Sequence, residues 1–183
     1  DEQGLIFSDG TRAEGGLLYT HDGDKLQIRV AEANRMIVDG NSRISLSNND
    51  GGANNTLFGK KAGNVLASGA NANLFIGEDA GLVQSTGDHN LAIGYSAMGN
   101  STGTDADKNV VIGNYAGDAF GSAEVANTTI IGHQAGSAIN HADASGTVLV
   151  GYNTGIALTS GIGNVSIGSG SMAANATSDY NTA

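Results

Sequence analysis

The sequence predicts an all-β protein, with a small antiparallel β module at residues 1–50 and a repetitive β-solenoid or β-roll at residues 51–183. Three observations predict this. One short motif recurs seven times through the second part. Short apolar runs separated by Asp-Gly and Gly-Gly pairs fill the first part. The chain has 29 Gly, no Pro and only 5% aromatic residues, which favours a stack of thin layers over a conventional core.

Each copy of the motif is marked by an apolar residue followed by glycine. Four residues before the glycine stands Asn, or Thr in two copies, and three residues after it stands a small residue. The consensus is N-x-x-φ-G-x-x-A-G, and an eighth copy begins at Asn181. The marker glycines are Gly59, Gly77, Gly94, Gly113, Gly132, Gly151 and Gly168, spaced 17 to 19 residues apart. A fixed period of this length is typical of a solenoid, with length variation confined to its outer loops.

The glycines exclude a helical repeat. Each glycine inside a helix makes that helix about 1 kcal/mol less stable than alanine would, and most copies carry two glycines at fixed places. The three residues before each marker glycine are therefore expected to be extended.

Alternation within these short strands predicts two faces. The residues three and one before the glycine, such as Leu74 and Ile76, are nearly all apolar and are expected to face inward, together with the residue six after it. The residue two before the glycine is then expected to face outward. It is nonetheless large and apolar in most copies, which predicts an interface between chains. The predicted interface residues are Leu57, Phe75, Val111, Ile130 and Leu149.

The asparagine column has a structural interpretation. Side-chain amides stacked about 4.8 Å apart can bond to each other and to the backbone at a corner. The predicted ladder consists of Asn55, Asn73, Asn90, Asn109 and Asn164.

Residues 1–50 are expected to form four or five short antiparallel strands. Apolar runs at 5–7, 17–19 and 36–38 and the alternating segments 26–30 and 44–46 are separated by turn pairs such as Asp9-Gly10 and Asp39-Gly40. The polar cluster at 48–55 is expected to be the turn-rich connection to the repeats.

Charge and composition exclude several classes of function. The net charge is −10, and residues 62–183 hold Lys108 as their one basic residue against nine acids, so nucleic acid is not an expected partner. No apolar run reaches membrane-spanning length, so membrane insertion is not expected. The chain has no Cys. It begins without Met and stops inside a repeat, from which we expect a fragment of a longer protein.

No motif predicts catalysis, a cofactor or a metal. The four histidines, His21, His89, His133 and His141, show no ligand spacing. The acids Glu78-Asp79, Asp105/Asp107 and Asp118/Glu124 are the candidates for a glycosidase pair, but thin coils offer no obvious cleft between two carboxyls.

The position after the marker glycine carries an aromatic ring in three copies. Tyr95, His133 and Tyr152 are therefore candidate receptor contacts, because a row of rings can stack on sugars.

Several segments resemble two known families. The repeats Asn55-Thr56-Leu57-Phe58-Gly59 and Asn109-Val110-Val111-Ile112-Gly113 are similar to those of phage tail fibres, and Asn164 to Ala173 is similar to the head repeat of trimeric autotransporter adhesins. The segments 16–30 and 35–40 also resemble a stretch common in tail fibres.

The resemblance implies an elongated, parallel homotrimer in the tail fibre of a virion or injection particle. Such a fibre is exposed to the extracellular medium, attached to other tail proteins, and takes part in host attachment through a carbohydrate or protein receptor. A polysaccharide-degrading tailspike domain and an adhesin head remain as alternatives. Whether each chain closes its own coil or three chains wind together is left open by the sequence.

Overall fold

The computed structural model describes residues 2–8, 13–21, 23–30, 33–38, 44–46, 54–82, 85–100, 106–120 and 124–183. The chain divides into two compact units, residues 1–48 and 49–183. The predicted boundary at residue 50 lies outside the described residues. The described residues contain β-strands and one 3-10 turn, Ala142–Ala144, and no helix among them is long and apolar enough to cross a bilayer.

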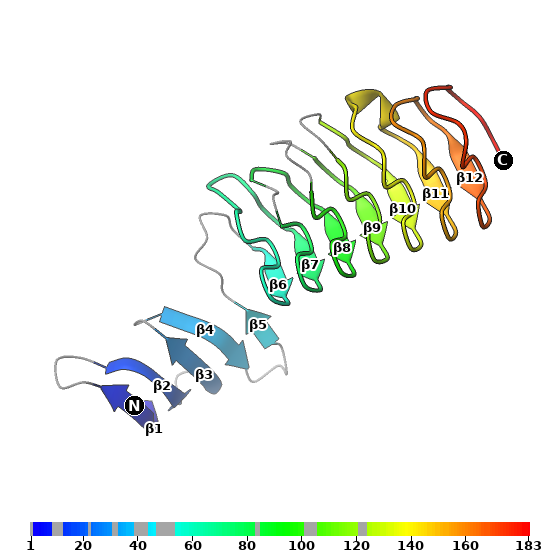
Figure 1. Cartoon of the computed structure of the whole chain (residues 1–183). Coiled ribbons are helices and arrows are strands. Elements are labelled where there is room, and N and C mark those ends of the chain that lie inside the picture. The colour runs from blue at the N-terminus through cyan, green and yellow to red at the C-terminus, as the bar shows by residue number, and fades with distance from the viewer. Residues whose placement is uncertain are drawn as a thin grey trace. The chain divides into compact units, whose positions relative to one another are not determined.

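The first unit is a five-stranded antiparallel sheet, which confirms the predicted fold class. Each strand pairs with the next along the chain, as expected where tight turns join consecutive strands. The strands are β1 (Glu2–Ser8), β2 (Ala13–Thr20), β3 (Lys25–Val30), β4 (Ala33–Val38) and β5 (Ile44–Leu46). Figure 1 shows them in this order.

One face of this sheet is apolar and uncovered. The register places Leu5, Leu17, Ile28 and Met36 in one row across four strands. Tyr19 and Leu26 pair in the neighbouring row on the same face. The exposed fractions of Leu5, Leu17 and Ile28 are 63%, 46% and 42%, whereas Leu18 and Gln27 on the opposite face are buried.

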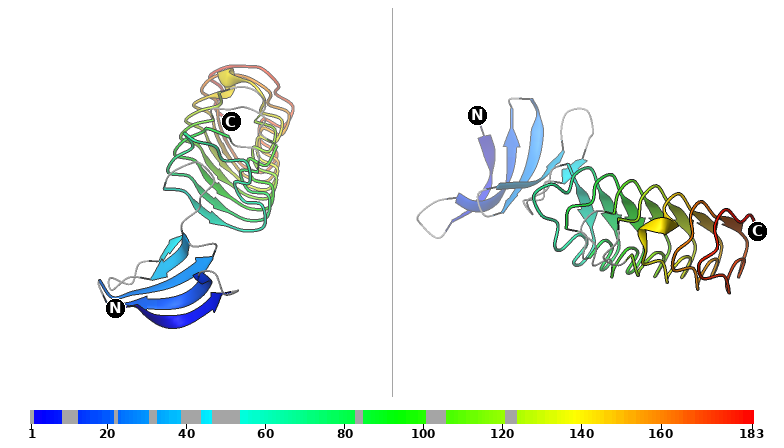
Figure 2. Two further views of the ribbon diagram at one scale, coloured as in Figure 1. Left: turned by 90° about the vertical axis from the view of Figure 1, so that its left-hand side faces the viewer. Right: turned by 90° about the horizontal axis from the view of Figure 1, so that it is seen from above.

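The second unit is a parallel β-solenoid with one short strand per turn. Its seven strands stack in sequence order and in register, as Figure 1 shows. The strands are β6 (Thr56–Phe58), β7 (Leu74–Ile76), β8 (Leu91–Ile93), β9 (Val110–Ile112), β10 (Thr129–Ile131), β11 (Val148–Val150) and β12 (Val165–Ile167). A single chain closes each coil, and the coils follow one another along the unit in the right-hand view of Figure 2.

The core of the solenoid is built from a few positions in each turn. At the turns of β6, β9, β10 and β11, the central residue of the strand points inward and lies in the same core as the residue seven after the marker glycine. At the turn of β9, Val111 and Phe120 are both fully buried, and both lie against Gly117. At β10, Ile130 and Ile139 lie in the same way against Gly136. Small residues three after the marker, such as Ala80, Ala97 and Ala135, complete the inner wall.

The predicted faces of the strands are therefore inverted. Phe75, Val111, Ile130 and Leu149 are fully buried inside their own chain, and Leu57 packs against the same core, so the prediction that this column faces outward as an interface is wrong. The residues three and one before the glycine face outward and are partly exposed. The predicted inward position six after the glycine is also off by one residue, because Leu66, Phe120, Ile139 and Leu158 are the buried ones.

The marker glycine is required by close stacking of the corners. At Gly113 the backbone has φ 137°, and an added Cβ would collide with the backbone oxygen of Gly132 in the next turn. The same collision recurs from Gly59 to Gly151. Two residues later the chain is left-handed even without glycine, as at Gln134 with φ 53°. The marker glycine and the left-handed residue two positions later turn the chain out of the strand. The residue between them is the one that follows the marker glycine.

Candidate ligand-binding surface

Asparagine side chains form a hydrogen-bonded ladder inside the solenoid. Asn90 donates its backbone N–H and its Nδ2 to Oδ1 of Asn73, at 2.9 and 3.1 Å. Its Nδ2 also donates to the carbonyl of Ala106, at 2.6 Å. Asn55, Asn73, Asn90, Asn109 and Asn164 are all buried. Each amide thus satisfies backbone groups of two turns, which makes the ladder a structural element with no free group for a ligand.

At two turns threonine takes the place of asparagine in the ladder. Thr128 donates from Oγ1 to Oδ1 of Asn109 at 2.8 Å, and Thr147 donates to the carbonyl of Gly161 at 3.4 Å. Asn164 then resumes the pattern and accepts from Nδ2 of Asn181 at 2.9 Å. A hydroxyl has one donor hydrogen and an amide has two, so Thr128 and Thr147 offer fewer side-chain donors to the ladder than asparagine does.

The most distinctive surface feature is an aromatic row made of Tyr95, Tyr115, His133 and Tyr152. The ring centroids of Tyr95 and Tyr115 are 5.2 Å apart in an edge-to-face arrangement, and those of Tyr115 and His133 are 6.2 Å apart. His133 and Tyr152 are stacked, with centroids 5.7 Å apart and an interplanar angle of 23°. All four side chains are exposed. The row therefore crosses four consecutive turns.

The row is positioned by the glycine corner. Tyr95, His133 and Tyr152 each follow a marker glycine, and the carbonyl of each accepts a backbone hydrogen bond of 2.8 to 3.0 Å from the next turn. At the remaining turn the equivalent residue is Asn114, whose Oδ1 accepts from the backbone N–H of Tyr95 at 2.9 Å. The next residue, Tyr115, fills that place in the row from a left-handed backbone with φ 58°.

Three of the four rings were predicted from the sequence as candidate receptor contacts, and the structure brings them together. Tyr115 was missed because it lies one residue out of phase with the other three. The signal that could have found it is its position two residues after the marker glycine, where the backbone is left-handed.

A charged pair continues the aromatic row toward β6. Lys60 and Glu78 occupy the same position in the two preceding turns, and Lys60 Nζ lies 2.7 Å from Glu78 Oε1. The hydrogen bond from Lys60 lowers the pKa of Glu78 and raises that of Lys60. Next along the row, the electrostatic influence of Tyr115 is the largest cause that raises the pKa of Tyr95, so this phenol remains neutral at physiological pH.

The candidate acids lie in different surroundings. Glu78 is held by Lys60, and Asp107 accepts through Oδ1 from the backbone N–H of Asp88 at 2.7 Å. Burial raises the pKa of Asp118, which is partly buried, whereas Glu124 is exposed. Asp105 lies outside the described residues. Among the residues described, no group of three or more His, Cys, Asp or Glu could hold a metal ion.

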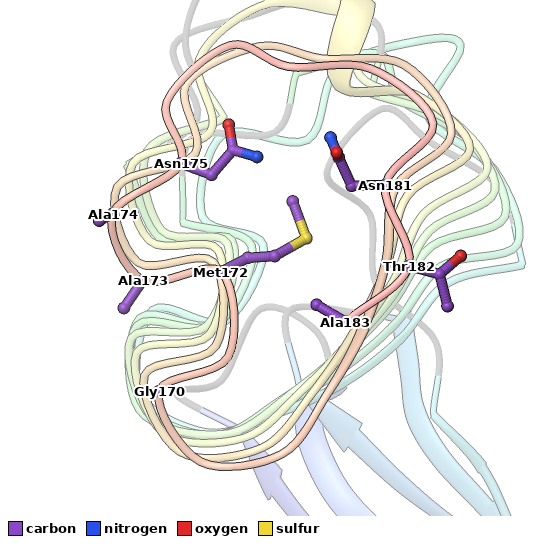
Figure 3. Close-up of a pocket in the computed structure, with 8 residues that line it drawn as sticks. All are labelled: Gly170, Met172, Ala173, Ala174, Asn175, Asn181, Thr182 and Ala183. Carbon is purple, nitrogen blue, oxygen red and sulfur yellow. The ribbon is translucent and has the colours of Figure 1, made fainter.

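A hollow lies in the last turn of the solenoid. Figure 3 shows Met172 and Asn181 pointing into the coil and Ala173, Ala174 and Thr182 pointing away from it. The hollow is lined by Gly170, Met172, Ala173, Ala174, Asn175, Asn181, Thr182 and Ala183. None of these side chains ionises, so the hollow offers no acid or base. The aromatic row is the stronger candidate for a ligand-binding surface.

Comparison with models of protein families, with curated proteins and with solved structures finds no match to this chain.

Proposed function

We propose that this chain is a structural and adhesive segment of a homotrimeric tail fibre, exposed to the medium on a virion or injection particle and used in host attachment. The observation that carries the proposal is the outward face of β6–β12. Its side chains form two columns, Thr56, Leu74, Leu91, Val110, Thr129, Val148 and Val165 beside Phe58, Ile76, Ile93, Ile112, Ile131, Val150 and Ile167. All except two threonines are apolar, and none is charged.

The size of this face favours association. Seven strands spaced about 4.8 Å apart, with three residues of about 3.3 Å each, make an apolar surface of about 29 by 10 Å. That area is at the low end of the range of the largest apolar patch on a typical monomer, about 300–600 Å², which is often functional. It is smaller than the roughly 800 Å² per partner of a standard interface. The uncovered sheet face of residues 1–48, with Leu5, Leu17 and Ile28 exposed, offers a second apolar surface to the same assembly.

A second copy of this chain is the partner that fits the solenoid face. Its columns repeat at the strand spacing, so a parallel copy presents ridges with the same spacing along every turn. A globular partner with irregular side chains would match only a few turns. The number three comes from the resemblance of the repeats to trimeric fibres.

The experiment that tests this proposal is a measurement of mass in solution by native mass spectrometry and light scattering. A trimer has three times the chain mass of 18.3 kDa. Ile112→Arg, at the centre of the face, should dissociate it, because burying unpaired guanidinium groups is strongly unfavourable. Asn140→Arg, at an exposed position away from this face, is the matched control and should leave the mass unchanged. A wild-type mass of 18.3 kDa at micromolar concentration would overturn the trimer.

A further inference from the structure

We infer that the aromatic row of Tyr95, Tyr115, His133 and Tyr152 is a glycan-binding site that takes an extended, uncharged oligosaccharide lying along the solenoid axis. This inference deepens the adhesive part of the proposed function by naming the ligand class and the residues that would bind it. It does not depend on the number of subunits.

The first argument is the exposure of the rings. Tyr152 and Tyr95 have exposed fractions of 56% and 40% although each is in contact with a neighbouring ring of the row. Elsewhere in the described solenoid Phe75 and Phe120 are fully buried, and Phe58 and Tyr180 are exposed without a ring contact to another described aromatic side chain. Exposed aromatic area that forms a continuous row is typical of a surface that binds a partner.

The second argument is repetition at a spacing that suits a polymer. Ring centroids follow one another at 5.2, 6.2 and 5.7 Å across four turns. This step is comparable to the length of one sugar unit in a chain. Sugar rings carry an apolar face of C–H groups, and such faces stack on aromatic rings. Successive sugars can thus contact successive turns through those parts of the rings that the edge-to-face and stacked contacts leave exposed.

The third argument is rigidity. The backbone of the row is fixed by hydrogen bonds between turns, from Tyr115 N to Tyr95 O at 2.9 Å, from Gln134 N to Asn114 O at 3.0 Å and from Asn153 N to His133 O at 3.0 Å. Edge-to-face and stacked contacts also restrict the rings. A site that is ordered before binding loses less conformational entropy when the ligand arrives.

The fourth argument concerns charge. Beyond Tyr95 the row continues into Glu78, which is held by Lys60. Residues 62–183 carry a net charge of −8, from one basic and nine acidic residues, so an anionic polymer would be repelled. The carboxylate and ammonium groups can instead hydrogen-bond the hydroxyls of a neutral glycan at that end.

The test is to apply the intact chain to a printed array of neutral and acidic oligosaccharides, and then to titrate the best neutral hexasaccharide by calorimetry. Tyr152→Ala and His133→Ala should each weaken binding by about two- to tenfold, the value of one aromatic contact. Tyr152→Phe should retain affinity, because the ring face is preserved. Tyr180→Ala is the matched control, since Tyr180 is exposed and lies outside the row.

The outcomes separate this inference from the trimer. Loss of binding in the two alanine variants with unchanged mass supports the glycan site. Failure to bind any neutral oligosaccharide overturns it, as does binding that is equally strong in Tyr152→Ala. Binding only to acidic glycans that disappears with added salt also overturns it. None of these results changes the measured subunit number, which is the test of the proposed assembly.

Discussion

Asn73 directs two donors, its backbone N–H and its side-chain Nδ2, to a single oxygen, Oδ1 of Asn55, at 2.9 and 3.1 Å. The two residues are 18 positions apart in sequence and adjacent in space. The amide of one turn therefore organises the backbone of the next, and repetition of this relationship keeps the turns aligned.

The first prediction concerns this ladder. Asn90→Ala removes the acceptor for Nδ2 and the backbone N–H of Asn109, and the donor to Ala106. Leaving buried polar groups unpaired costs about 1–3 kcal/mol each, so the free energy of unfolding should fall by at least that amount. Chemical denaturation would measure it. Asn140→Ala, at an exposed position, should change the stability by less than about 0.5 kcal/mol, and an equal loss in both variants would contradict the ladder's role.

The second prediction distinguishes the two faces of the strands. Phe75 is fully buried, whereas Phe58, one position nearer its marker glycine, is 68% exposed. Phe75→Ala should lower the free energy of unfolding of the subunit by about 3–5 kcal/mol, because it leaves a cavity in the core. Phe58→Ala should cost far less in a dissociated subunit. Thermal unfolding of both variants in the Ile112→Arg background would show this, and the reverse order would restore the original assignment of faces.

Much of the fold could be predicted from the sequence. The fixed spacing of Asn, glycine and the small residue predicted each of the seven solenoid strands, and the turn pairs predicted the antiparallel first unit. These features are set by the backbone: left-handed corners, close approach at glycine and amide ladders each restrict the residue type, so they are visible in the pattern.

Which side chains of each strand face the core could not be predicted as well from the sequence. A strand of three residues that are all apolar, such as Leu74-Phe75-Ile76, gives no polar position to mark the outer face, and a shift of one residue exchanges the faces. A usable signal was nevertheless present. The buried Asn73 lies two residues before Phe75, and residues two apart in a strand share a face.

Three of the four members of the aromatic row were predicted from the sequence. Tyr115 was not, because it lies two residues after its marker glycine, at a left-handed corner, whereas the other three lie one residue after theirs.

The third prediction concerns strain at the corners. Gln134 has φ 53°, a conformation that costs most residues roughly 1–2 kcal/mol and glycine almost nothing. Gln134→Gly should therefore raise the free energy of unfolding, by less than this amount because glycine also makes the unfolded chain more flexible. Gln134→Ala keeps the strain and should give no gain. A melting temperature that falls in the glycine variant would contradict this reading.

The fourth prediction is a pH dependence. Burial raises the pKa of Asp118 above its ordinary value of 3.8, so the folded state binds a proton more tightly than the unfolded state at this position. The associated stability is fully present below the unfolded pKa and is lost as the pH rises through the raised folded pKa. Asp118→Asn should thus stabilise the protein at neutral pH and lose that advantage below about pH 3.9. Denaturant midpoints measured from pH 3 to 8 would show the two curves converging at low pH.

The strands remain paired in register from β6 to β12, although the marker glycines are 17 to 19 residues apart. Removal of residues 114–132 would join Gly113 directly to His133 and return the chain to the same phase. The length of the solenoid therefore changes in whole units: duplication or loss of one unit alters it by a single step of about 4.8 Å, and only the turns on either side of the junction gain a new neighbour.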